Sequence, residues 1–400
     1  MVKPRILVLA AIASVGLAAC GGSSTTGTAP SKPDKVQIAA EGPFTGNQAF
    51  IGEGALRAIT LAVKDFNTAG GVNGTPVELV TWDDQHNAQT AQTFQQQGIS
   101  DTTILGIVGP MNSGVANGTE KGLQAATPPL PFVSESASDV AVTDSGNSVA
   151  HRVCARDDQQ GPADAKFMID QGAKKVFVMD AKSDYSIGLA DKTEAALKAK
   201  NIPTQRESVK GGGPAPDFST IIQKIKSFGA DWVYFADEGP EAAPLVSQMK
   251  QKDLTIGQNI QFMGSDGEDS ASIITDSQGA YLGAYATNIT ADPAGLTTTA
   301  AANYVAEYKA AYNADGLAKA GPFYGSAYEA AQVLLQAIKN SPVKNGKISR
   351  ADVLSHLGTD TFHTIFGDVK FNAKGDVATG GIFVFQAKGT QMVVVKQISG

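Results

Sequence analysis

A small-molecule site is predicted in six short segments that each follow an apolar run of the chain. The segments are Gly42 to Ala49, Pro110 to Ser113, Ser134 to Asp139, Asp180 to Tyr185, Asp237 to Pro240 and Gly264 to Glu268. If the apolar runs are parallel strands, their carboxyl ends meet at the edge where open α/β sheets bind ligands. The polar and glycine-rich composition of these segments is suited to binding.

Catalytic chemistry is poorly represented in the same sequence. It contains no Gly-x-Ser-x-Gly nucleophile motif, and "GPMNSGVA" lacks the lysine that ends a phosphate-binding loop. The adjacent acids of "WDDQ" and "RDDQQG" are poor acid–base pairs, because neighbouring strand residues face opposite sides; we interpret Asp158 as a helix N-cap. The four histidines are scattered without metal-ligand spacing and are expected to make surface or polar contacts: His86, His151, His356 and His363. We expect no enzyme, no metal and no cofactor.

The elements that position the six segments alternate along the chain. Strands are expected within residues 36–40, 75–84, 103–110 and 130–138, and again within 173–180, 230–237 and 260–267, with helices in between. A third stretch predicts helices at Thr298–Tyr312 and Tyr324–Lys339, then a hairpin-like strand pair around Lys374–Asp376. Alternating strands and helices with apolar runs in the strands indicate parallel sheets, here in two α/β lobes.

The amino terminus predicts export and lipidation. Lys3 and Arg5 precede the mostly apolar run Ile6–Leu17, which is too short to span a bilayer and is typical of a signal peptide. "LAAC" then matches a bacterial lipobox, which would make Cys20 the lipidated first residue of the mature chain. The alternative is an ordinary signal peptide that happens to end at a cysteine. The Gly-, Ser-, Thr- and Pro-rich residues that follow predict a flexible tether.

Composition limits the possible partners of the remaining chain. A net charge of −7 without any basic block argues against nucleic-acid binding. A hydrophobic fraction of 42% is enough for substantial cores. With only two cysteines, lipidation of Cys20 would leave Cys154 without a disulfide partner, and we expect it to be buried and inert.

The body of the chain resembles the substrate-binding proteins of branched-chain amino acid ABC transporters. The resemblance runs from about residue 36 to about 387. It depends on the order of motifs such as "GPFTG", "NTAGGVNG", "DDQQGP" and "FMG". It implies a periplasmic binding protein type 1 fold, with two Rossmann-like lobes joined by three crossovers. The implied organisation is a signal peptide at 1–19, a tether at 20–34, a first lobe from 35–152 plus 288–381, and a second from 153–287 plus 382–400.

The resemblance also implies a set of ligand residues. Ser113 opens a helix and would meet the ligand carboxylate, and the loop Ser136-Ala137-Ser138 would contact carboxylate and ammonium. In the second lobe, Tyr185 lies where the family has a ligand-contacting tyrosine, and Asp266 where it has the acid that pairs with the ammonium. The alternatives are that the serines are helix caps and that Asp266 belongs to a turn.

Two positions depart from the family pattern. Phe50 and Ile51 precede Gly52-Glu53, where amino acid binders often have an aromatic residue. Glu238 replaces a tyrosine at the side-chain end of the pocket. Glu238 could face the cleft and disfavour an aliphatic ligand, because an unpaired carboxylate beside leucine would be costly, or it could face solvent.

The expected function is that of a lipid-anchored, extracytoplasmic solute-binding protein of an ABC importer. It would capture an amino acid or analogue between closing lobes and deliver it to permease and ATPase subunits at the membrane. The alternatives are an extracytoplasmic sensor that uses the same fold and, less favoured, a hydrolase.

Overall fold

The computed structural model describes residues 31–210, 216–377 and 381–398. Cys20, the predicted signal peptide and most of the predicted tether lie outside this part of the chain. Residues 31–34, which the prediction assigned to the tether, belong to the compact unit that begins at Ser31. There the Asp34 amide donates to the Gly346 carbonyl at 2.8 Å, and the Thr75 hydroxyl donates to the Pro33 carbonyl at 2.6 Å.

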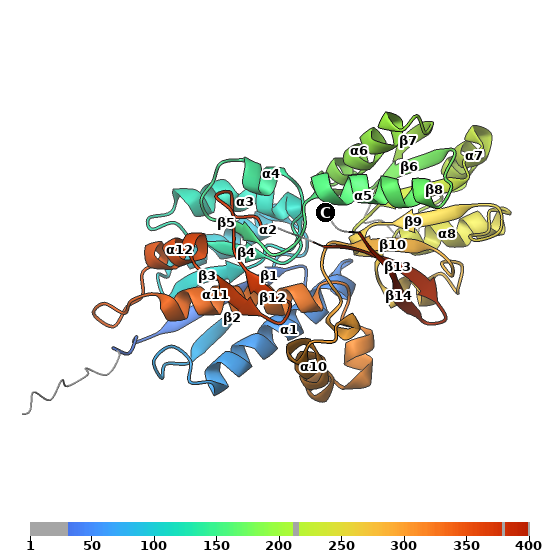
Figure 1. The fold of residues 1–400 in the computed structure, drawn as a ribbon. Coiled ribbons are helices and arrows are strands. Elements are labelled where there is room, and N and C mark those ends of the chain that lie inside the picture. The colour runs from blue at the N-terminus through green and yellow to red at the C-terminus, as the bar shows by residue number, and fades with distance from the viewer. Residues whose placement is uncertain (1–30, 211–215, 378–380, 399–400) are drawn as a thin grey trace, which may run out of the picture. The chain divides into compact units, whose positions relative to one another are not determined.

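Among the described residues, the first sheet has five parallel strands in the order β2-β1-β3-β4-β5 (Figure 1). They are β1 (Val36–Gly42), β2 (Val77–Asp83), β3 (Ile104–Val108), β4 (Phe132–Ser134) and β5 (Ala150–Arg152). Neighbouring strand residues face opposite sides, so the apolar runs supply two buried faces. Ile107 packs with helix residues Ala116 and Leu123, whereas Val108 packs on the other side with Ala55 and Leu334.

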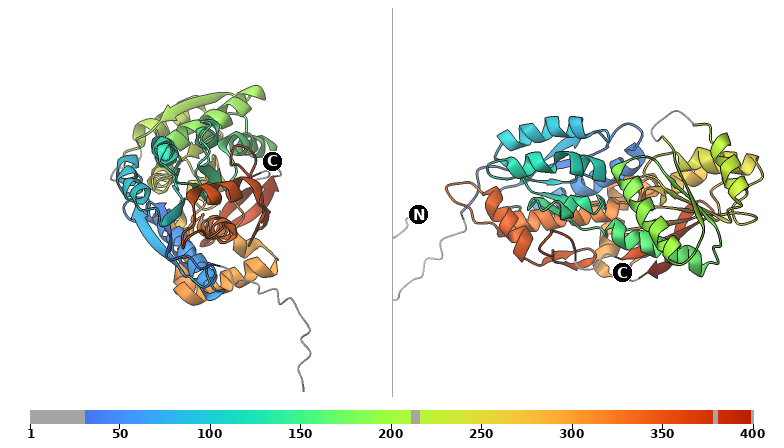
Figure 2. Two further views of the ribbon diagram at one scale, coloured as in Figure 1. Left: turned by 90° about the vertical axis from the view of Figure 1, so that its left-hand side faces the viewer. Right: turned by 90° about the horizontal axis from the view of Figure 1, so that it is seen from above.

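The helices of this first lobe cover both faces of its sheet (Figure 2). One face packs against α2 (Ala88–Ser100), α3 (Ser113–Ala125) and α4 (Ala141–Asp144). The other packs against α1 (Ala49–Thr68), α10 (Thr299–Ala318), α11 (Tyr324–Asn340), α12 (Arg350–Thr359) and the hairpin of β11 (Phe362–Thr364) and β12 (Gly367–Val369). The carboxyl ends of the strands therefore remain available for ligand-binding loops.

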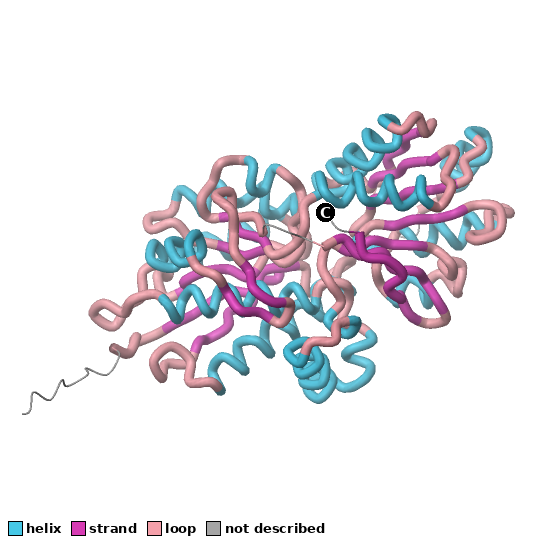
Figure 3. The backbone as a smooth tube through the Cα atoms, in the orientation of Figure 1, coloured by secondary structure: helices cyan, strands magenta, loops and turns pink. Residues whose placement is uncertain are grey.

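The second sheet has seven strands in the described chain, in the order β14-β13-β10-β9-β8-β6-β7. Figure 3 shows the strands of the molecule in magenta, with cyan helices beside them. They are β6 (Val176–Asp180), β7 (Thr204–Ser208), β8 (Trp232–Ala236), β9 (Gln261–Gly264), β10 (Tyr285–Asn288), β13 (Ile382–Lys388) and β14 (Gln391–Ile398). Strands β6 to β10 are parallel, and β13 and β14 add an antiparallel edge.

Helices again cover both faces of the second sheet. Val178 and Tyr234 pack with residues of α5 (Asp157–Asp170) and α6 (Asp184–Ala199). Met179 and Phe235 pack with residues of α7 (Ser219–Phe228), α8 (Ala242–Gln251) and α9 (Ala271–Asp276). Two 3₁₀ turns complete the described elements: η1 (Asp266–Glu268) and η2 (Pro293–Gly295).

The chain passes from the first sheet to the second through residues 153–156, and leaves it again through 289–292. The third predicted crossover involves residues 378–380, which lie outside the described chain. The two-lobed α/β architecture is confirmed, while the predicted chain limits of the lobes stay a prediction.

Some local predictions need correction. The residues around Lys374–Asp376 form a turn that one antiparallel bridge closes, between Phe371 and Val377. No longer strand pair flanks the turn, because β12 pairs with β11 and β13 pairs with β10 and β14. Five strands were not predicted: β5, β7, β10, β11 and β14. Asp158 is a helical residue of α5 whose carboxylate pairs with the Arg156 guanidinium at 3.0 Å, and Arg156 occupies the N-cap position.

Candidate ligand-binding site

A small cavity lies between loops of the two lobes at the carboxyl ends of their strands. Its volume is about 20 Å³, roughly the room of one water molecule. Five of the seven residues predicted for the ligand site line it: Ser113, Ser136, Tyr185, Glu238 and Asp266. The other lining residues are Ile51, Met111, Asn112, Gly267 and Phe323. The lobes therefore enclose the predicted site closely.

The first-lobe side of the cavity is built from the loops after β3 and β4. Ser113 is the first residue of α3 and follows the N-cap Asn112, whose side chain caps no amide of the helix. The Ser113 hydroxyl accepts a hydrogen bond from the Asp139 amide at 3.2 Å, and the Ser136 hydroxyl donates to the Met111 carbonyl at 2.8 Å. Neither serine is an N-cap, and both hydroxyls lie at the cavity.

Ala137 and Ser138 lie behind this surface and do not line the cavity. The Ala137 amide donates to the Ser134 hydroxyl at 2.9 Å, and its carbonyl accepts from the Arg152 guanidinium at 2.9 Å. The Ser138 hydroxyl is fully buried and has no hydrogen-bond partner among the described residues. Their contact with a ligand stays a prediction.

Asp266 is the carboxylate at the second-lobe side of the cavity. It lies in the turn η1 and accepts hydrogen bonds from the Tyr185 hydroxyl and, at 2.9 Å, from the Gln160 amide. Burial raises the pKa of Asp266 to about 6, although the bonds from Tyr185 and Gln160 act in the opposite direction. Its partners are neutral donors, so no protein cation compensates its charge here.

Gln160 was not predicted as a site residue, although it belongs to the quoted "DDQQGP" motif. It occupies α5 and also donates to the Thr287 hydroxyl at 3.1 Å.

Glu238 faces the cavity and not the solvent, since only 8% of the residue is exposed. One of its carboxylate oxygens, Oε2, accepts a hydrogen bond from the Asn112 amide of the first lobe at 3.2 Å. The other, Oε1, lies 3.3 Å from Nε2 of His86, also in the first lobe. His86 and Asn112 were not predicted as site residues, because contacts between loops so distant in sequence leave no local signal.

Ile51 and Phe323 add apolar surface to the same cavity. Ile51 lies in the first turn of α1, at the position where the family pattern often has an aromatic residue. Phe323 is the N-cap residue of α11. The site thus combines two apolar side chains with acids, amides and hydroxyls, and no lysine or arginine lines it in the described chain.

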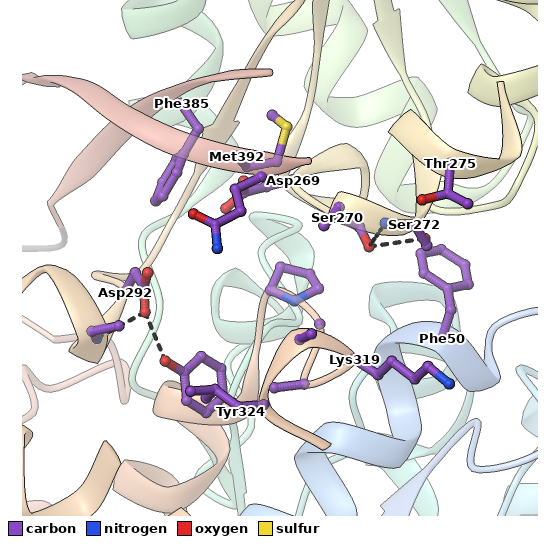
Figure 4. A pocket seen from close by; sticks show the side chains of 18 of the residues that line it. Phe50, Asp269, Ser270, Ser272, Thr275, Asp292, Lys319, Tyr324, Phe385 and Met392 are labelled. Atoms are coloured by element: carbon purple, nitrogen blue, oxygen red, sulfur yellow. Dashed lines mark hydrogen bonds between the residues drawn. The ribbon is translucent and has the colours of Figure 1, made fainter. Parts of the chain in front are cut away.

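A second, larger cavity has a volume of about 840 Å³ (Figure 4). It is lined by the start of α1, the segment from Asp269 to Asp276, the segment between α10 and α11, and the β13–β14 turn. The Tyr324 hydroxyl donates to Asp292 at 2.8 Å at one side of it. None of the predicted ligand residues lines this cavity. Residues of both lobes line it, so the lobes are not packed tightly on this side.

The other histidines and Cys154 offer no catalytic arrangement. His356 and His363 pair with Asp360 and Asp368, and burial lowers the pKa of His151 to about 4. Cys154 is buried as predicted, and burial raises the pKa of its thiol. In the described part of the chain, no group of three or more His, Cys, Asp or Glu residues could bind a metal ion.

No helix of the described chain is both long enough and apolar enough to cross a bilayer.

Comparison with known proteins identifies the family. Residues 35–391 match the family model described as periplasmic binding protein. The amino acid binding protein of Pseudomonas aeruginosa is 29% identical over 382 residues, which are 93% of this chain and 95% of that protein. The Leu/Ile/Val-binding protein homolog 2 of Brucella abortus is 29% identical over 353 residues, or 88% and 90% of the two chains.

Solved structures agree with these relatives. The leucine binding protein LivK of Thermotoga maritima superposes with a TM-score of 0.80 at 25% identity, covering 91% of this chain and 98% of that one. A solute binding protein of R. palustris in complex with benzoate has a TM-score of 0.76 at 19% identity, covering 91% and 96%, and shows the shared fold alone. This chain therefore belongs to the periplasmic binding protein family, as a solute-binding protein of the branched-chain amino acid ABC transporter type.

Proposed function

We propose that this protein captures an amino acid or a close analogue in the small cavity and delivers it to an ABC importer. The observation that carries the proposal is that the Asp266 carboxylate lines one cavity between the two lobes together with two serines, Ser113 at the first residue of α3 and Ser136 in the loop after β4. The amino terminus of a helix favours an anion, and a buried carboxylate favours a cation. An α-amino acid head group carries both charges, an ammonium and a carboxylate that are joined through one carbon atom.

In this proposal, Ser113 and Ser136 meet the ligand carboxylate, with Ala137 and Ser138 behind them. Asp266 and Tyr185 meet the ammonium group. A cavity of about 20 Å³ has no room for an amino acid. Binding therefore requires the lobes to separate and then close on the ligand, which is the hinge motion typical of two-lobed binding proteins.

We further propose that the far end of the ligand carries a hydrogen-bond donor. At the cavity, Oδ1 of Asn112 has no hydrogen-bond partner among the described residues, and Oε1 of Glu238 is contacted by Nε2 of His86 at 3.3 Å. A buried acceptor without a partner is costly, and a ligand amide, hydroxyl or ammonium would satisfy Asn112 and add a donor beside the Glu238 carboxylate. An aliphatic side chain such as that of leucine would offer a donor to neither residue.

The test is a thermal-shift screen, followed by calorimetry, over polar, cationic and aliphatic amino acids, polyamines, amides and aromatic acids. A ligand at one hundred times its Kd stabilises the protein by about 2.7 kcal/mol. We expect polar amino acids to bind more tightly than leucine, and Glu238→Tyr to shift the ranking toward leucine and isoleucine. Benzoates that bind while amino acids do not would contradict the proposal, since a benzoate has no ammonium for Asp266.

Membrane attachment through lipid on Cys20 is the second part of the proposal. It is supported by the lipobox "LAAC" and by the family, whose members work outside the cytoplasm with a membrane permease. Cys20→Ser should leave the domain folded but release it from the membrane fraction or leave the precursor unprocessed. Membrane-fraction blotting measures this, and unchanged anchoring of the variant would refute lipidation at Cys20.

A further inference from the structure

His86 has an unusual backbone in the loop between β2 and α2. Gln85 and His86 both have positive φ angles, 52° and 59°. Two successive non-glycine residues in this left-handed region are uncommon, and such conformations gather at functional sites. The surrounding bonds stabilise the loop, because the His86 amide donates to Asp84 at 2.8 Å and Asn87 caps α2. The loop presents the imidazole at a defined position.

That imidazole contacts the opposite lobe. His86 Nε2 lies 3.3 Å from Oε1 of Glu238, which follows β8 of the second lobe. Asn112 donates through the same amide nitrogen to Glu238 at 3.2 Å and to Gln48 at 2.8 Å. We call these residues, His86, Asn112, Gln48 and Glu238, the cross-lobe cluster. His86, Asn112 and Gln48 belong to the first lobe, and Glu238 belongs to the second. Glu238 can therefore contact the other members only when the two lobes are closed.

Charge makes His86 the decisive member of the cross-lobe cluster. The side chain of Glu238 is only 10% exposed, and a buried carboxylate needs a cation or several donors. Burial alone would raise the pKa of Glu238, but the His86 and Asn112 contacts lower it below its ordinary value. Burial alone would lower the pKa of His86, but Glu238, Asp84 and Glu241 raise it. These three acids are the charged groups facing the imidazole, and all favour its protonated form.

Other contacts also join the lobes in the described chain. The Asn117 amide of α3 donates to Asp184 of α6 at 3.3 Å. Beside the crossover at 153–156, the Asp157 amide donates to the Ser138 carbonyl at 3.0 Å, and the Arg156 guanidinium pairs with Asp376 at 3.0 Å. Among these contacts, the cross-lobe cluster is the one that depends on a histidine.

We infer that His86 is a positioning residue that, as an imidazolium, binds Glu238 across the cleft and stabilises lobe closure, so that closure weakens as rising pH deprotonates it. The consequence for ligand affinity rests on the proposed function, because a closed site must form around the ligand. Closure of the ligand-free protein does not depend on that proposal and can be measured alone.

The experiment measures lobe separation in the ligand-free full chain by electron–electron double resonance. Spin labels are placed at Lys121→Cys in α3 and Ala195→Cys in α6, which are exposed positions on opposite lobes. All proteins carry Cys20→Ser, and Cys154 is buried, so only the introduced thiols are labelled. Distance distributions are recorded from pH 6 to pH 9.

We expect the ratio of closed to open protein to fall at least about threefold over this range in the otherwise unchanged chain. His86→Gln should be more open at pH 6 and independent of pH. His86→Lys should stay closed at pH 9, because a lysine remains charged there. Gln85 and Lys182 already have positive φ angles in this chain, so both side chains tolerate the backbone of position 86.

Two further variants separate this role from a general effect on folding. Glu238→Gln should abolish the pH dependence, as His86→Gln does. His363→Gln removes an exposed histidine–aspartate pair within the first lobe and should leave the profile unchanged. A pH-independent distance in the parent protein, or a profile that His86→Gln does not alter, would overturn the inference. Neither result depends on which solute binds, so a failed amino acid screen alone would overturn only the proposed function.

Discussion

At the residue scale, the proposed function makes recognition of the ligand head group depend on the charge of Asp266. Asp266→Asn keeps the shape of the side chain but removes the charge that would pair with a ligand ammonium. Charge-assisted hydrogen bonds contribute about 1.5–3 kcal/mol, so the variant should bind its amino acid about tenfold or more weakly. Calorimetry at pH 7.5 measures this loss.

Asp253→Asn is the matched control, because Asp253 is exposed at the end of α8 and has a positive φ angle that asparagine accepts readily. It should bind like the parent protein. Equal affinity of Asp266→Asn and the parent would remove Asp266 from the site. Since the pKa of Asp266 is about 6, affinity for an ammonium ligand should also fall as pH drops below that value.

At the scale of elements, α1 positions one side of the site through a close approach between backbones. A Cβ atom added to Gly54 would collide with the Ala320 carbonyl in the segment that leads to α11. The same segment carries Phe323 to the cavity, and α1 carries Ile51. The Tyr308 hydroxyl also donates to the Gly54 carbonyl at 3.2 Å, which joins α10 to this contact.

Gly54→Ala should therefore destabilise the protein by about 1–3 kcal/mol, as overpacking does. Gly122→Ala is the comparison, because Gly122 lies inside α3 with no atom within 4 Å of an added Cβ. That variant should be stabilised by about 0.5–1 kcal/mol, since alanine favours a helix. Urea unfolding measures both, and equal effects at the two positions would refute the packing argument.

At the scale of the whole molecule, buried carboxyl groups should control stability as a function of pH. Burial raises the pKa of Glu135, Asp269 and Glu329 to about 8, and that of Asp84 and Asp266 to about 6. The folded protein keeps these protons at pH values where the unfolded chain has lost them. This contribution to the free energy of unfolding should therefore be complete below about pH 4 and be lost as pH rises from there through about 8.

Urea midpoints at pH 5.5, 7 and 9 test this expectation. Burial lowers the pKa of His151 to about 4, so its contribution makes the free energy of unfolding rise with pH between about 4 and 6.5. This single histidine is outweighed by the several buried carboxyl groups. Neither carboxylate oxygen of Glu135 has a hydrogen-bond partner among the described residues. Glu135→Gln should therefore raise the free energy of unfolding by more than about 1 kcal/mol at pH 9, where the folded protein buries a charged Glu135, and by less at pH 5.5. Glu78→Gln, at an exposed ion pair, should leave the pH profile unchanged. A midpoint that rises with pH would contradict the prediction.

The sequence by itself determined the two-lobed α/β architecture and five of the ten residues that line the small cavity. Strands such as "VFVMD" and "WVYFA" are continuously apolar because both faces of a parallel sheet are covered, and this signal is local. Strand β7, "TQRES", escaped prediction because a half-exposed edge strand needs no apolar run. The loops after the strands were found by a rule about sheet edges, and five predicted residues do line one cavity.

Only the tertiary structure decided which of those residues touch the cavity and which other residues join them. Ser136 and Ser138 are two positions apart, yet one lines the cavity and the other is buried behind it. His86, Asn112 and Glu238 meet although 126 positions separate the last two, because closure brings the edges of two sheets together. Such contacts depend on how the two sheets face each other, and no local pattern of residue types records that geometry.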